Sequence, residues 1–112
     1  MGQLQMDVAK TPRGVVARFD GEAGLEQGQE MERHMSLLAQ LPPGLLVIDL
    51  SNLIAISSVG FGLLIRYRNE LETAGGRMKL ASLRPQVMDA FRHAKLDKLF
   101  EIHPTVDAAV GN

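Results

Sequence analysis

The chain has 112 residues, 46% of them hydrophobic and 22% charged, and a formal net charge of -1. These values predict one soluble globular domain over residues 1–112, and the absence of a basic stripe argues against direct binding to nucleic acid. Cysteine is absent, which excludes disulfides, and no apolar run approaches the roughly 20 residues that span a bilayer. With no secretory signal pattern at the N-terminus, we expect a cytoplasmic protein that does not insert into membranes.

The N-terminal segment predicts a β-hairpin. Residues 6–9 and 15–19 are the two strands, and the turn between them contains Pro12 and Gly14. Proline and glycine supply the fixed and the permissive backbone positions that a reversal needs. Residues 20–24, which include two glycines, are expected to form a loop.

A helix is predicted over residues 25–41, because Met31, Met35 and Leu38 recur at helical spacing while charged residues face elsewhere. Pro42-Pro43-Gly44 ends this helix, since proline cannot continue the hydrogen-bond ladder.

Residues 45–50 are apolar on both faces except for one aspartate, as expected of a strand buried in the middle of a sheet. A polar break at Ser51-Asn52 and a second apolar patch follow this strand. Ser57 or Ser58 then begins a helix that runs to about residue 73, before the two glycines that end it.

The C-terminal third predicts a strand over residues 78–83, a helix that begins near Pro85, a short strand over 99–103 and a terminal helix over 104–110. Strands that alternate with helices indicate an α/β fold. We expect a single domain with a mixed, mostly parallel central sheet of about five strands and about four helices.

The sequence contains no complete catalytic or cofactor motif. Gly60-Phe61-Gly62 lacks the third glycine of a dinucleotide fingerprint, and residues 56–60 lack the first glycine of a hydrolase elbow. The three histidines, His34, His93 and His103, lie on separate segments without metal-ligand spacing. We therefore expect no enzyme activity, no catalytic residue, no metal and no cofactor.

The start of the helix at residue 58 carries the most informative side chains. Ser57 is predicted to be the N-cap, whose side-chain oxygen accepts a hydrogen bond from a helix N–H. The hydroxyl of Ser58 is then free to project outward from a helix end that stabilises anions. Two interpretations of Gly60 remain open: close packing of the helix on the sheet, or bare backbone presented with Gly62 to a partner. The helical phase of Phe61 indicates partial exposure.

Residues 47–64 resemble the signature of STAS domains, named for sulphate transporters and anti-sigma factor antagonists. In that family an apolar-Asp-Leu-Ser strand leads into Asp/Ser-Ser-x-Gly-x-x-x-Leu. Residues 20–22, 75–80 and 83–87 are also similar to family segments, so that the resemblance covers essentially the whole chain.

Stand-alone chains of this length resemble bacterial anti-sigma factor antagonists. The resemblance implies that Ser58 is a phosphoacceptor for an anti-sigma factor that is also a serine kinase. The unphosphorylated antagonist binds that kinase and so frees a sigma factor, which regulates transcription. A serine phosphatase reverses the modification. The residue before the acceptor is commonly aspartate in this family, whereas here it is serine. The implied partner-binding residues are Ser57, Ser58, Val59, Gly60, Phe61 and Gly62.

The resemblance also leaves two alternatives. The first alternative is a STAS accessory subunit of an ABC-type transport system, which docks on the ATPase through the same helix without phosphorylation. The other alternative is a sensor of a small anion or nucleotide, bound beside the start of the helix.

Overall fold

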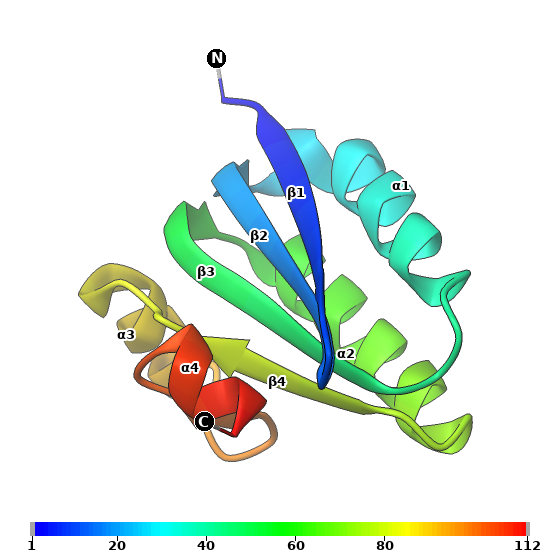
Figure 1. Ribbon diagram of the computed structural model, residues 1–112. Coiled ribbons are helices and arrows are strands. Elements are labelled where there is room, and N and C mark those ends of the chain that lie inside the picture. The colour runs from blue at the N-terminus through cyan, green and yellow to red at the C-terminus, as the bar shows by residue number, and fades with distance from the viewer. Residues whose placement is uncertain (1, 112) are drawn as a thin grey trace.

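The computed structural model describes residues 2–111 (Figure 1). These residues form an α/β fold around one five-stranded mixed sheet in the order β1-β2-β3-β4-β5. β1 and β2 are antiparallel, whereas every other neighbouring pair is parallel. The elements are β1 (Leu4–Thr11), β2 (Gly14–Ala23), the 3-10 helix η1 (Leu25–Gln27), α1 (Gly28–Ala39), β3 (Leu45–Ile56), α2 (Ser58–Thr73), β4 (Arg77–Ala81), α3 (Pro85–His93), β5 (Glu101–His103) and α4 (Val106–Val110). The predicted fold class and element order are confirmed. Met1 and Asn112, which the one-domain prediction included, lie outside the described residues.

Three helices cover one face of the sheet and α4 lies on the other (Figure 1). Because the parallel strands follow one another in chain order, right-handed crossovers place α1, α2 and α3 on the same side. Leu46 and Ile48 of β3 face the main core beneath these helices, whereas Val47 faces a smaller cluster with Ala109 and Val110 of α4. β3 is therefore buried on both faces at the centre of the sheet, as predicted.

β3 is longer than the sequence predicted, because the polar residues after Leu50 stay in the strand instead of breaking it. The backbone N–H of Ser51 donates to Asp49 Oδ1 at 3.0 Å, and Asn52 Nδ2 donates to Asp20 Oδ1 at 2.6 Å. The pairing register with β2 shifts at this point, as in a β-bulge. The bulge accommodates the polar residues, and the strand continues to Ile56.

The loop predicted at residues 20–24 is also wrong, because β2 continues to Ala23. Gly21 has a φ of 118°, a conformation that glycine adopts without strain. It pairs with Leu4 on one side and Leu53 on the other. The sequence pattern at Gly21 predicted the end of a strand, whereas in the structure this glycine allows β2 to continue.

The first predicted helix begins as the 3-10 helix η1 and becomes regular only at Gly28. Buried Gln27 fixes this segment: its Oε1 accepts from the N–H of Gly24, and its Nε2 donates to the carbonyl of Gly2, both at 3.0 Å. The second predicted helix is confirmed as α2. Within residues 2–111, no helix has the length and apolar character to cross a membrane.

Candidate functional site

The junction between β3 and α2 is held against the end of β2. Ser57 is the N-cap of α2, with an extended φ of -113°. Its backbone N–H donates to the carbonyl of Ala23 at 3.0 Å, and its hydroxyl donates to the same carbonyl at 3.4 Å. The predicted cap position is confirmed, but the predicted bond is wrong, because the hydroxyl does not accept from a helix N–H. The Ser57 hydroxyl instead bonds to the carbonyl of Ala23 in β2.

Ser58 is the first residue of α2 and is exposed. Across residues 2–111, no hydrogen bond engages its hydroxyl. The first N–H groups of a helix lack intrahelical carbonyl partners and carry a partial positive charge. A group attached to this hydroxyl would therefore lie in solvent beside the positive end of α2.

The two glycines of α2 have different physical explanations. Gly60 is buried, and a Cβ there would lie 2.8 Å from the carbonyl oxygen of Ala23 and 2.8 Å from Cγ1 of Ile56. Close packing of the helix on the sheet therefore accounts for Gly60. Gly62 is exposed, and a Cβ there would meet no atom within 4 Å. Internal packing gives no reason for a glycine at this second position.

Phe61 lies between core and solvent. Its ring is partly buried and packs edge-to-face on the ring of Phe91 of α3, with centroids 4.9 Å apart and planes at 88°. The predicted partial exposure is confirmed. The ring also fixes α2 to α3, so that a charged substitution would disturb folding as well as the surface. Val59, also partly buried, lies beside Gly28, where a Cβ would be 3.1 Å from Val59 Cγ1.

The sequence analysis did not identify two apolar residues that are exposed close to this junction. Leu25 of η1 is 76% exposed and Ile54 of β3 is 46% exposed. Leu25 follows Ala23 by two residues and Ile54 precedes Ser57 by three, so both lie close in the chain to the bond between Ala23 and Ser57. The sequence analysis placed Leu25 at the start of a predicted helix and Ile54 in the apolar patch after Asn52. Only the position of η1 and the length of β3 bring them to the surface here.

The histidines make local structural contacts. His34 Nε2 lies 2.9 Å from the carbonyl of Leu4, and His103 Nε2 lies 2.6 Å from Glu101 Oε2. The hydrogen bond from His103, with those from Lys79 and Arg77, lowers the pKa of Glu101 to about 2. Among residues 2–111, no three acidic or histidine side chains are grouped in a way that would hold a metal ion.

The profile of the STAS domain family matches residues 5–109, and the chain belongs to this family. Among solved structures, it is similar to an anti-sigma factor antagonist from Mycobacterium paratuberculosis. The two share 25% identity and a TM-score of 0.85, over 96% of this chain and 91% of the other.

More distant structures show the same fold. The Bacillus cell fate determinant SpoIIAA in its phosphorylated form is 22% identical, with a TM-score of 0.67 over 96% of both chains. A sulfate transporter family protein from Wolinella succinogenes is 11% identical, with a TM-score of 0.70 over 85% of this chain and 80% of that one. The fold is therefore shared by antagonists and by transporter-family proteins.

Proposed function

We propose that this STAS domain is an anti-sigma factor antagonist in a partner-switching pathway. In this proposal it binds a serine-kinase anti-sigma factor while Ser58 is unmodified, and phosphorylation of Ser58 releases it. A serine phosphatase restores the binding form. Residues 1–112 act as one domain, and the function requires neither catalysis by this chain nor a cofactor.

The observation that carries the proposal is the exposed, unengaged hydroxyl of Ser58 at the first position of α2. The hydroxyl of Ser57, in contrast, points to the carbonyl of Ala23 and is only partly exposed. A kinase can therefore approach Ser58 without displacing an internal contact. The similarity to the mycobacterial antagonist supports the proposed antagonist role.

The surroundings of Ser58 support protein binding. Exposed Gly62 allows a partner backbone to approach α2 closely, and partly exposed Phe61 offers an aromatic contact of the kind that dominates interfaces. Phosphorylation adds about -1.5 to -2 charges at neutral pH. Burying that charge in an interface without a matched cation is costly, so the partner is released.

The test is intact-mass measurement after the purified chain is incubated with ATP and the serine kinase that co-purifies with it. We expect one added phosphate on the wild-type chain and on Ser57→Ala, and none on Ser58→Ala. Peptide mapping should place the phosphate on Ser58. A phosphate retained by Ser58→Ala and lost from Ser57→Ala would overturn the assignment.

Binding gives the second half of the test. The unmodified chain should bind the kinase, and the phosphorylated chain should bind at least about tenfold more weakly, a difference of about 1.4 kcal/mol. Equal binding by both forms would refute the switch. If the chain instead captures a transport ATPase with no dependence on phosphorylation, the accessory-subunit alternative is correct.

A further inference from the structure

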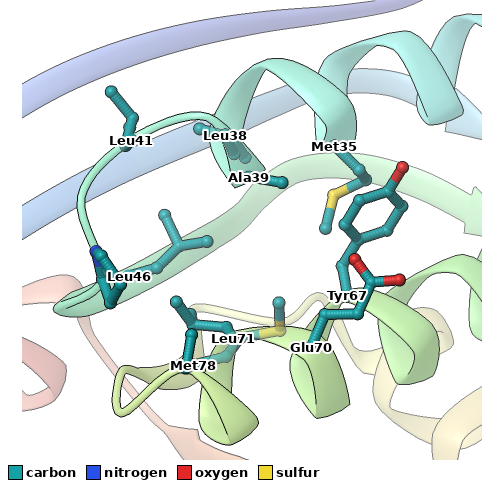
Figure 2. A pocket seen from close by; sticks show the side chains of 11 residues that line it. Met35, Leu38, Ala39, Leu41, Leu46, Tyr67, Glu70, Leu71 and Met78 are labelled. Carbon is teal, nitrogen blue, oxygen red and sulfur yellow. The ribbon is translucent and has the colours of Figure 1, made fainter.

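A cavity of about 200 Å³ lies between α1 and α2, at the opposite end of α2 from Ser58 (Figure 2). Its floor consists of four buried apolar side chains: Met35 and Leu38 of α1, Leu46 of β3 and Met78 of β4. Two small residues, Ala39 at the end of α1 and Ala74 just after α2, also line it. The cavity is therefore a depression in the helical layer that reaches down to the sheet.

Two lining residues, Tyr67 and Glu70, carry polar groups. The ring of Tyr67 lines the cavity, and the Tyr67 hydroxyl lies 2.9 Å from Ser36 Oγ. This hydrogen bond between α1 and α2 holds the Tyr67 ring in place at the cavity wall. The carboxylate of Glu70 stands beside the Tyr67 ring at the side of the opening, and Arg66 Nε pairs with it at 3.2 Å (Figure 2). This carboxylate can accept a hydrogen bond and disfavours an anion in the cavity.

The volume restricts the ligand to a small molecule. An apolar cavity of about 150 Å³ accommodates benzene, whereas sites for drug-sized ligands occupy about 300–1,000 Å³. A nucleotide or a flavin would extend well beyond this volume. Thioether sulfurs favour contact with aromatic rings and adapt to their shape, and Met35 and Met78 both present such sulfurs to the floor.

We propose that this cavity binds a neutral molecule with a single aromatic ring and one hydroxyl group. The ring occupies the space above Met35 and Met78, beside the ring of Tyr67. The ligand hydroxyl donates a hydrogen bond to the Glu70 carboxylate at the cavity wall. The site is separate from the surface proposed around Ser58, and binding here needs neither a kinase nor phosphorylation.

The chain supplies its own reporter, because Tyr67 is its one tyrosine and it has no tryptophan. Benzyl alcohol is a suitable probe, since it absorbs at shorter wavelengths than those that excite tyrosine. Titration into the full chain should give a saturable change in Tyr67 fluorescence, with amide shifts in two-dimensional NMR confined to the residues around the cavity. Benzoate, of similar size but negatively charged, should bind at least about tenfold more weakly.

Substitution at the opening tests the location. Ala39 of α1 lines the cavity and is exposed, so that Ala39→Met should fill the opening with little effect on folding. This variant should bind benzyl alcohol at least about tenfold more weakly than the matched control Ala39→Ser. Ala74→Met, from the opposite side of the opening, should give the same loss. Thermal unfolding verifies that each variant is folded.

Three results would overturn the proposal. A fluorescence change that rises linearly to the solubility limit would show that the cavity does not bind the probe. Unchanged affinity in folded Ala39→Met and Ala74→Met would place the probe elsewhere. Benzoate binding as tight as benzyl alcohol would refute the stated ligand class.

Discussion

Replacing Gly62 by alanine separates folding from partner binding. A Cβ at this exposed position of α2 meets no atom within 4 Å, so the folded state accepts it without strain. Alanine is favoured over glycine inside a helix by about 1 kcal/mol. We therefore expect Gly62→Ala to raise the free energy of unfolding by about that amount. For a chain of this size the unfolding temperature should rise by about 4 °C.

The same methyl group should weaken the proposed complex. If a partner backbone packs on the bare Cα of Gly62, an added methyl group overpacks the interface. Overpacking of a well-packed contact costs about 1–3 kcal/mol. The affinity for the kinase should then fall about 5- to 150-fold, although the variant is more stable than the wild type.

Calorimetry of unfolding and titration of the purified kinase measure the two effects on the same preparations. Thr73→Ala is the matched control, because it changes an exposed residue at the far end of the same helix. It should stabilise the chain slightly and leave binding unchanged. A stabilised Gly62→Ala that binds as tightly as the wild type would refute a close approach at Gly62. A destabilised variant would refute the reasoning about the helix itself.

Three other substitutions test the remaining assignments. Gly60→Ala should lower the free energy of unfolding by about 1 kcal/mol, measured in urea, because the new Cβ meets the carbonyl of Ala23 at 2.8 Å; stabilisation would contradict this packing. Ser57→Ala should change the free energy of unfolding by less than about 0.5 kcal/mol, because the Ser57 hydroxyl makes no hydrogen bond to a helix N–H. Thr105→Ala should lower it by about 1 kcal/mol, because the Thr105 hydroxyl accepts a hydrogen bond from the N–H of Ala108. Equal losses in the two variants would be inconsistent with these bonds. The pKa of Glu101 falls from 4.5 to about 2, so its contribution is complete above about pH 4.5 and is lost as the pH drops toward 2. The carboxylate is about one-third exposed, and solvent screening limits its contribution to about 1 kcal/mol. Glu101→Gln should therefore flatten the pH dependence of the free energy of unfolding in this range. An unchanged pH profile would show that Glu101 does not cause this dependence.

The regular helices and strands could be predicted because a single hydrophobic pattern in the sequence identified each of them. The spacing of Met31, Met35 and Leu38 identified α1, and the continuous apolar run of residues 45–50 identified the central strand. The errors occurred where tertiary contacts overrode local signals. Residues 51–52 are polar and were expected to break β3, but the side chain of Asp20, from another strand, pairs with Asn52 across the bulge. The sequence around residues 51–52 gives no indication that Asp20 lies beside them.

The candidate site was predictable in position but not in detail. Sequence placed two serines at the start of a helix, and the structure confirms that start. The direction of the Ser57 hydroxyl depends on the carbonyl of Ala23, which comes from a strand 34 residues earlier. The different surroundings of Gly60 and Gly62 likewise depend on which side of α2 meets the sheet. Leu25 was missed because its exposure follows from the 3-10 start of the first helix.

The position of Ser58 explains how a charge could control binding in the proposed switch without disturbing the fold. The first turn of α2 has no acidic side chain, and its N–H groups favour an anion by about 0.3–1 kcal/mol. A phosphate there remains in solvent in the free domain and requires no rearrangement of the core. Gly60, two residues further on, is already in close contact with the sheet, so the helix start is held in place in either state. The phosphate charge therefore destabilises the complex and not the free domain, because a bound partner would have to exclude water from the phosphate.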